Sequence, residues 1–155
     1  VMGIDSTFLS AFAKSQIACG TILPSIGKVF ISIDDDNKKF ILKIVKKLIN
    51  LNFIIVATKG TAKFLKENNL TVETIYKVKE GGSHIVQAIA DNKIDLVINT
   101  TKTQGSIRDS YSIRRTSLTQ NIPYYTTVAG AKVAIDTIEH LKNNNLKVKS
   151  LQDLT

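Results

Sequence analysis

Short apolar runs alternate with longer segments of helical periodicity along most of this chain, and this alternation restricts the folds open to it. The runs at 28–33 and 53–57 are rich in β-branched residues and have the length of strands, and the second contains no polar residue. A strand that is apolar throughout is typical of a parallel sheet with helices on both faces. Further strands are expected at 72–75, 96–98 and 124–127.

The segments between these runs have the spacing of amphipathic helices. A helix is expected from the acidic run at 34–36, which offers N-cap candidates, to about residue 50, with lysines over most of its exposed surface. Its buried stripe is predicted to consist of Phe40, Ile41, Ile44, Val45 and Leu48. Strands alternating with helices predict a three-layer αβα fold around a central, mainly parallel sheet of about five strands.

Composition indicates a single hydrophobic core, stabilised neither by disulfides nor by a metal ion. Hydrophobic residues make up 43% of the 155 residues, enough for one sizeable core. Cys19 is the only cysteine, so neither a disulfide framework nor a zinc site is expected. No apolar run approaches the roughly 20 residues needed to cross a bilayer, and the N-terminus lacks the regions of a secretion signal. We therefore expect a cytoplasmic chain with no cofactor of its own.

The first 26 residues have a pattern of their own. Ser6 is a candidate N-cap for a short amphipathic helix, and glycine and proline between 20 and 27 mark a linker. The apolar stripe of that helix would consist of Phe8, Leu9, Phe12 and Ala13. Because the chain begins with valine, we expect it to be a piece of a longer polypeptide, with the tail of a preceding unit at 1–26 and the main domain at 27–155.

The formal net charge of +8 raises the question of nucleic-acid binding. Many lysines alternate with apolar positions, and aromatic residues make up only 6% of the chain, which offers no evident platform for stacking bases. Small anionic ligands are therefore the favoured partners, and a nucleic-acid-binding module is kept as an alternative.

A polar tetrapeptide, Thr58-Lys59-Gly60-Thr61, follows the second predicted strand. In an open parallel sheet, ligands bind beyond the carboxyl ends of the strands, where helices begin. Two hydroxyls, an ammonium and backbone amides at a helix N-terminus suit a phosphate group. The alternative is that Gly60 only turns the chain and the threonines only cap the next helix. The spacing is not that of a P-loop.

Polar residues follow the other predicted strands as well. Lys77 comes after the third strand, and Asn99, Thr100 and Thr101 end the fourth. Because parallel strands end at one edge, these residues are expected to share a rim with the tetrapeptide, where the amide of Asn99 could contact a base or ribose. Lys38, in the first turn of its helix, could also reach this rim.

Groups suited to catalysis are sparse on the rim. The candidates for a general base are Glu80, His84 and Asp109, and none has an evident partner in the sequence. Asp109 is instead expected to cap a helix over 109–121, and His140 to have a solvent-facing or helix-dipole role at a helix end. No catalytic residue is therefore predicted.

Five short stretches together resemble one family. They are ATKGTA at 57–62, YKVKEG at 76–81, INTT at 98–101, IRR at 113–115 and YTT at 125–127. With these stretches, residues 27–154 resemble the methylglyoxal synthase-like regulatory domain that closes the large subunit of carbamoyl phosphate synthetase. The first 14 residues are similar to the end of the ATP-grasp unit that precedes this domain.

The resemblance implies both a ligand and a parent enzyme. Nucleotide monophosphates, with UMP as inhibitor and IMP as a second candidate, would bind through nine residues: Lys38, Thr58, Lys59, Gly60, Thr61, Lys77, Asn99, Thr100 and Thr101. The parent would be an ATP-dependent ligase that uses Mg or Mn, works with a glutaminase small subunit and supplies carbamoyl phosphate to pyrimidine and arginine pathways. The fragment itself would be regulatory and non-catalytic, and its assembly into a homo-oligomer is left open.

Two departures from the family pattern affect these expectations. Some bacterial members bind ornithine through an acidic residue followed by threonine, but here Tyr125 precedes Thr126, so the ammonium of ornithine would lose its carboxylate partner. Methylglyoxal synthase uses an aspartate after a Gly-Gly pair to deprotonate dihydroxyacetone phosphate, and this chain has Ser83 there. A nucleotide is therefore favoured over ornithine, and phosphate-lyase activity is kept only as an alternative.

Overall fold

A five-stranded parallel sheet forms the centre of the protein, with strand order β3-β2-β1-β4-β5. The computed structural model describes residues 1–76, 84–100, 104–148, 150 and 152, and for 104–109 only the course of the helix. The strands are β1 (Gly27–Ser32), β2 (Phe53–Thr58), β3 (Glu73–Ile75), β4 (Leu96–Asn99) and β5 (Tyr124–Tyr125). The predicted fold class is confirmed, and all four strand pairings are parallel.

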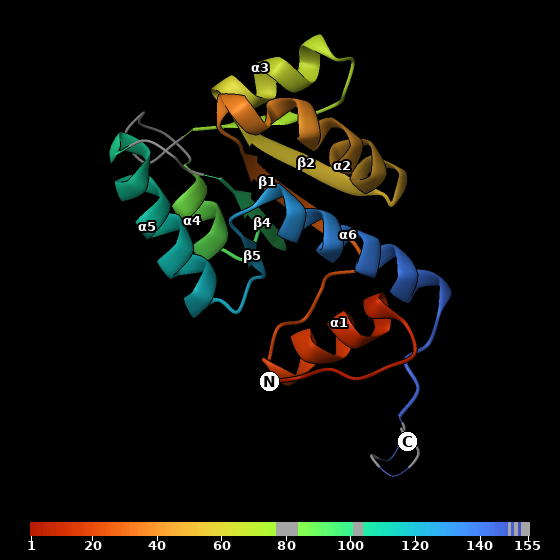
Figure 1. Ribbon diagram of the computed structural model, residues 1–155. Helices are drawn as coiled ribbons and strands as arrows, with labels where there is room; N and C mark the ends of the chain where they lie inside the picture. Colours follow the sequence, from red (N-terminus) through yellow and green to blue (C-terminus); the bar gives the residue numbers. More distant parts are fainter. Residues whose placement is uncertain (77–83, 101–103, 149, 151, 153–155) are drawn as a thin grey trace.

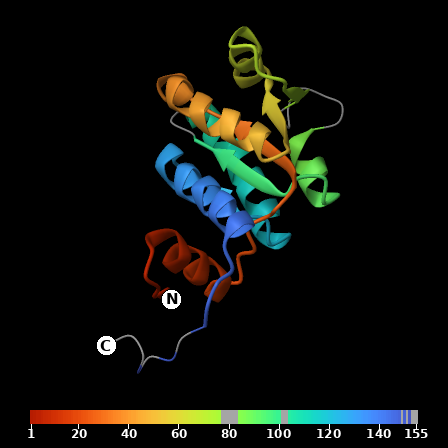
Figure 2. The ribbon, with the colours of Figure 1, turned by 90° about the vertical axis from the view of Figure 1, so that its right-hand side faces the viewer.

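Six α-helices and one short 3₁₀ helix in the described residues complete the fold (Figure 1). They are α1 (Phe8–Ala18), η1 (Asp35–Asn37), α2 (Lys38–Asn50), α3 (Lys59–Glu67), α4 (Ile85–Ala90), α5 (Gln104–Thr119) and α6 (Val128–Asn143). Figures 1 and 2 show α2 and α6 on one side of the sheet and α4 and α5 on the other. The arrangement has the three layers that the alternation of elements predicts.

Strand β1 supplies side chains to both cores. Val29 and Ile31 point into the larger core with residues of α2, α3 and α6, whereas Phe30 points into the smaller core with residues of α4 and α5. All three side chains are 0% exposed. Because neighbouring residues of a strand face opposite ways, the middle of a strand that is covered on both faces is apolar at consecutive positions.

Four of the helices end in the same way. Each is followed by an asparagine with a positive φ angle, and these residues are Asn52, Asn69, Asn92 and Asn121. After α3, the amide of Leu70 donates to the carbonyl of Leu65, which satisfies a carbonyl that the helix leaves unpaired. Asparagine tolerates the left-handed conformation better than other residues with a Cβ, so its abundance in this chain has a structural use.

Helix α1 packs against α6 and does not extend away from the domain (Figure 1). Ala13 is buried, and Ser10 Oγ lies 2.9 Å from His140 Nε2 on α6. His140 is a half-buried basic residue in the last turn of α6, consistent with the expected helix-dipole role, and it also has a partner on α1. The residues before α1 run back along the helix, where a Cβ at Gly3 would collide with the carbonyl of Ala11.

Several predicted boundaries and caps are wrong. Thr7, not Ser6, caps α1, because its hydroxyl accepts the amide of Ser10 at 3.2 Å. Helix α5 begins at Gln104, so Asp109 lies inside the helix and does not cap it. The last strand ends at Tyr125, and Thr127 instead caps α6 by accepting the amide of Gly130.

The predictions of the apolar stripes of α1 and α2 are each partly wrong. Phe40 is 67% exposed, whereas the other four residues of the predicted α2 stripe are buried. Phe8 is also 67% exposed at the start of α1, although Ala13 is buried as predicted. Helical periodicity identifies the direction of a stripe, but the width that a neighbouring element covers depends on tertiary packing.

The buried face of α2 can be tested by comparing two positions on the same helix. Leu48→Ala is expected to lower the free energy of unfolding by about 2–5 kcal/mol, because Leu48 is fully buried. Phe40→Ala removes a larger side chain but should change this free energy by less than about 1 kcal/mol, because Phe40 is mostly exposed. Urea unfolding followed by circular dichroism measures both, and equal losses at the two positions would contradict the assigned face.

Candidate functional site

A pocket of about 500 Å³ lies at the carboxyl edge of the sheet, where β1 and β2 end and α2 and α3 begin. Its lining consists of Ser32, Ile33, Asp35, Lys38, Thr58, Lys59, Gly60, Thr61 and Lys63. Five of the nine predicted binding residues are in this set. The pocket adjoins the point where the strand order reverses, since β1 lies between β2 and β4 and the helices that follow β1 and β4 cover opposite faces.

The N-terminus of α3 forms one wall of the pocket. Thr58 is the N-cap residue, but its side chain makes no capping hydrogen bond. Its Oγ1 atom lies 3.5 Å from Ser32 Oγ and 3.4 Å from Thr61 Oγ1, so its contacts within the fold are long. Backbone amides in the first turn of a helix lack intrahelical partners, and together with the helix dipole they attract an anion.

Thr61 fixes the position of this helix end. Its Oγ1 accepts the amide of Ile33 at 3.1 Å, which ties α3 to the segment that follows β1. The side chain is 2% exposed. Because the oxygen accepts in this contact, the hydroxyl hydrogen can still be donated to an anion in the pocket. Thr61 therefore serves the fold and has a donor available for a ligand.

Gly60 lies inside α3, so the alternative that it turns the chain is wrong. It has no positive φ angle, and a Cβ at this position would meet nothing within 4 Å. The glycine is therefore not required by the backbone conformation. What it provides is open space beside the first turn of α3.

Lys38 reaches the pocket from the first residue of α2, as predicted. Its Nζ atom lies 2.6 Å from Asp35 Oδ1 and 5.9 Å from the centre of the Phe64 ring. The ring and the aliphatic stem hold the ammonium near the pocket, while the carboxylate of Asp35 pairs with it. An incoming anion would compete with Asp35 for this ammonium.

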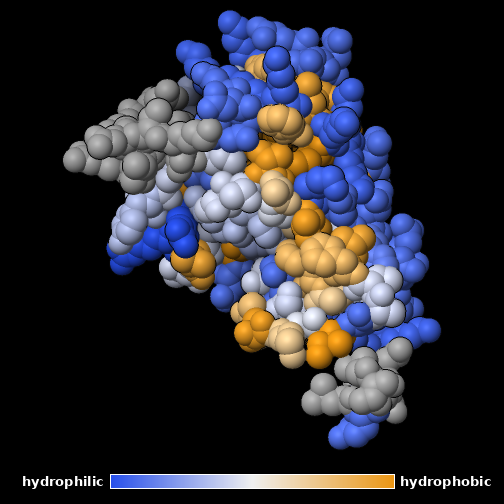
Figure 3. Space-filling view, viewed as in Figure 1, coloured by the Kyte–Doolittle hydropathy of each residue, from blue (hydrophilic) through white to orange (hydrophobic). Residues whose placement is uncertain are grey.

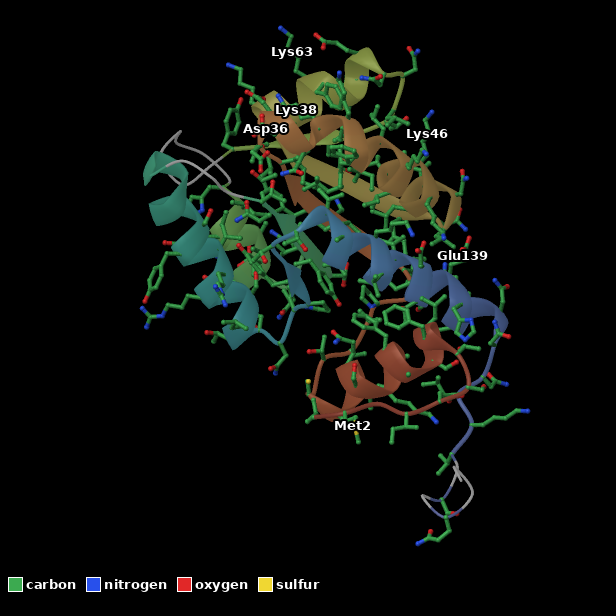
Figure 4. The ribbon with its side chains drawn as sticks, viewed as in Figure 1. Met2, Asp36, Lys38, Lys46, Lys63 and Glu139 are labelled. Atoms are coloured by element: carbon green, nitrogen blue, oxygen red, sulfur yellow. The ribbon has the colours of Figure 1, made fainter. Side chains whose placement is uncertain are left out.

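The surroundings of the pocket are mainly basic. Lys59 and Lys63 of α3 line it together with Lys38, whereas Asp35 is the single carboxylate in the lining described. Figure 4 shows Lys38 and Asp36 near the start of α2 and Lys63 on α3 at the same end of the molecule. Three ammonium groups and a helix N-terminus around one carboxylate favour a ligand with at least one negative charge.

Asn99 and Thr100 make hydrogen bonds within the fold, and their predicted binding roles remain predictions. Asn99 is 2% exposed, and its Nδ2 donates to Ser110 Oγ at 3.1 Å and to Tyr124 Oη at 2.8 Å. Thr100 Oγ1 accepts the amide of Asp34 at 3.1 Å. Both residues therefore hold the end of β4 to its neighbours, and neither lines the pocket described here.

Several predicted residues lie outside the described part of the chain. Lys77 and Thr101 are among them, as are Glu80 and Ser83. Their predicted roles remain predictions.

The position compared with an ornithine site is occupied by a structural contact. Tyr125 Oη donates to Gln16 Oε1 of α1 at 3.1 Å, and burial raises the pKa of Tyr125 to about 12. Thr126 is exposed. The tyrosine at this position therefore joins β5 to α1 as a neutral hydrogen-bond donor.

His84, a candidate general base, has a structural contact, and the described residues contain no cluster suited to a metal ion. His84 caps α4, because its Nδ1 accepts the amide of Gln87 at 3.3 Å. No group of three or more histidine, cysteine, aspartate or glutamate side chains with suitable positions for a metal ion occurs among the described residues. None of the described helices is long and apolar enough to span a membrane.

Ser32, Asp35 and Lys63 line the pocket but were not predicted as site residues. Ser32 ends β1, and the same reasoning that selected residues after the other strands could have found it. Lys63 lies four residues after Lys59 on α3, a spacing that places both on one helix face. Asp35 was predicted only as a candidate N-cap of the following helix and not as a pocket residue.

Comparison with known proteins gives consistent results. The family model described as MGS-like domain matches residues 40–126. The carbamoyl phosphate synthase large chains of Mesorhizobium japonicum and Myxococcus xanthus are each 46% identical over 153 residues, 99% of this chain. The carbamoyl phosphate synthase large chain, C-terminal section, of Methanopyrus kandleri is 43% identical over 155 residues. This chain spans 13%, 14% and 29% of the lengths of these relatives, respectively.

The competition between Asp35 and an anion for Lys38 can be tested directly. Asp35→Asn is expected to tighten the binding of inorganic phosphate by about two- to fivefold at low ionic strength, because it removes the carboxylate that pairs with the Lys38 ammonium. Isothermal titration calorimetry measures the affinity. Asp36→Asn is the matched control, since Asp36 is adjacent but does not line the pocket. An unchanged affinity in Asp35→Asn, or equal tightening in both variants, would contradict the competition.

Proposed function

Because this chain belongs to the MGS-like domain family, we propose that it is the effector-binding domain of a carbamoyl phosphate synthase large chain and that it binds nucleotide monophosphates. The pocket between α2 and α3 would hold the phosphate group. UMP is the first candidate and IMP the second. The observation that carries the proposal is the basic pocket at the N-terminus of α3, with Lys38, Thr58 and Thr61 in its lining.

The chemistry of the pocket supports a phosphate ligand. A phosphate dianion would accept hydrogen bonds from backbone amides of the first turn of α3 and from the hydroxyls of Thr58 and Thr61. Lys38 would exchange Asp35 for the phosphate, and Lys59 and Lys63 would add long-range attraction. A volume of about 500 Å³ is in the range of small-molecule sites and leaves room for a sugar beside the phosphate.

Several wider features of the proposal rest on the family resemblance and not on the structure. The parent chain would be the ATP-dependent, glutamine-hydrolysing ligase, with Mg or Mn beside ATP and a glutaminase small subunit as partner, working in the cytoplasm. Residues 1–26 would be the tail of the preceding unit and residues 27–155 the regulatory domain. An effector would change carbamoyl phosphate synthesis for the pyrimidine and arginine pathways by binding one conformation of the large chain better than another.

Nucleotide binding can be tested by thermal unfolding. UMP at about 100 times its dissociation constant should stabilise the chain by about 2.7 kcal/mol and raise the melting temperature, with IMP as a second ligand. Ornithine should give no shift, because Tyr125 replaces a carboxylate and contacts Gln16. The absence of a shift with both nucleotides would remove the proposal.

The role of Lys38 can be separated from a general effect of charge. Lys38→Met should weaken UMP binding by about tenfold or more, since it removes a charged donor from the pocket. Lys46→Met is the matched control, because Lys46 is an exposed lysine of the same helix that lies away from the pocket (Figure 4). Equal weakening in both variants would indicate a nonspecific electrostatic contribution. Steeply salt-dependent binding to mixed DNA or RNA, without preference for UMP, would instead support the nucleic-acid alternative.

Phosphate-lyase activity is the second candidate, and residue 83 argues against it. The serine there cannot act as a carboxylate base. The chain is therefore expected to produce no methylglyoxal from dihydroxyacetone phosphate, measured by a colorimetric assay with an authentic methylglyoxal synthase as positive control. Production at enzymatic rates would show that another group supplies the base.

A further inference from the structure

A second depression lies between α2 and α6, on the face of the molecule seen in Figure 1. Its volume is about 580 Å³. Phe40 and Ile44 of α2 and Val128, Ala129 and Ile135 of α6 form its apolar floor. Phe40 is 67% exposed, which is unusual for a phenylalanine on a helix with four buried apolar residues. Figure 3 shows apolar surface gathered in the middle of this face. We call this feature the α2–α6 groove.

The rim of the α2–α6 groove is basic. Lys39, Lys43, Lys47 and Lys132 line it, against one carboxylate, Asp136. Lys47 lies 2.7 Å and Lys132 2.8 Å from Asp136, so this carboxylate is already paired twice. Lys39 and Lys43, by contrast, are exposed, and no ion pair joins either of them to another described residue. The groove therefore combines an apolar floor with two ammonium groups, those of Lys39 and Lys43, that form no ion pair within the described part of the chain.

We propose that the α2–α6 groove docks an acidic amphipathic helix from the remaining part of the same large-chain polypeptide. Apolar residues of that helix would cover Phe40 and Ile44, and its carboxylates would face Lys39 and Lys43. This is the helix-in-groove mode of recognition, with charge complementarity at the rim. The inference rests on the proposed function, because the occupant belongs to the large chain of which this domain would be a part.

Other occupants fit the groove less well. A second copy of this chain would bring another surface from a protein of net charge +8 against four lysines. A nucleic acid would satisfy the lysines but not cover the apolar floor. A small ligand would leave much of Phe40 in water, whereas small-molecule sites enclose most of their ligand.

The length of the relatives favours a partner in the same polypeptide. This chain spans 13% and 14% of the Mesorhizobium japonicum and Myxococcus xanthus large chains. A tethered segment is present at an effective concentration on the order of millimolar, so even a modest interface would be occupied.

Photo-crosslinking in the full-length large chain with its small subunit tests the proposal. Phe40 is replaced by the photoreactive residue benzoylphenylalanine, and crosslinked peptides are identified by mass spectrometry. We expect a crosslink within one polypeptide, to a helical segment rich in aspartate or glutamate. The same replacement at Tyr111 is the matched control, because Tyr111 is 66% exposed but lies on α5, on the opposite side of the sheet. It should not capture that segment.

Charge reversal supplies the second arm of the experiment. In the crosslinking protein, Lys39→Glu with Lys43→Glu should lower the yield of the crosslink by about fivefold or more, whereas Lys46→Glu on the same helix should not. A crosslink to a second copy, to the small subunit or to a segment without acidic residues would overturn the proposal. So would the absence of a crosslink, or equal capture from position 111.

The outcome is independent of nucleotide binding. The Lys39→Glu, Lys43→Glu variant should keep its stabilisation by UMP, because neither lysine lines the phosphate pocket. Retained UMP binding with no intramolecular crosslink would remove the docking inference and leave the proposed function intact. Failure of the unmodified chain to bind either UMP or IMP would instead remove the proposed function.

Discussion

Strand β1 has neither a free edge nor a free face, and the other elements are arranged around it. It pairs with β2 on one side and β4 on the other, while Phe30 and its two neighbours fill the opposite cores. The chain must therefore leave β1 toward one face and leave β4 toward the other. The parallel pairing of β1 with β2 brings the ends of these strands together with the start of α3, beside the point where the connections diverge, and so positions the pocket.

Both proposed binding surfaces include residues of α2, but they use different sides of it. Lys38 lines the pocket at the N-terminus of α3, whereas Lys39, Phe40 and Lys43 line the α2–α6 groove. A small displacement of the first turn of α2 would therefore affect both surfaces. If an effector and a docked helix each contact one position of α2 better than another, the binding of one changes the affinity for the other. Regulation requires a physical link of this kind. The link depends on both proposals and follows from the shared helix.

The sequence predicted the layers of the fold because its strongest patterns are local. Each of the five strands overlaps a predicted one, and the alternation of strands with helices predicted their parallel arrangement. The pocket was predicted in part, because residues 58–61 adjoin a strand end and needed no tertiary information. The roles of Asn99 and Phe40 could not be predicted in this way. Asn99 finds its partners on α5 and β5, and the exposure of Phe40 depends on how far α6 covers α2.

The pocket lining runs from Ser32 to Lys63, within a single β-α-β-α segment. The pairing of β1 with β2 joins Gly27 to Phe53, whereas the pairing of β1 with β4 joins Val29 to Leu96. Contacts between residues closer in sequence close shorter loops and form with a smaller entropic cost. During synthesis on the ribosome, the half of the sheet that carries this pocket can therefore assemble before β4 emerges, and any ligand of the pocket would favour that early assembly.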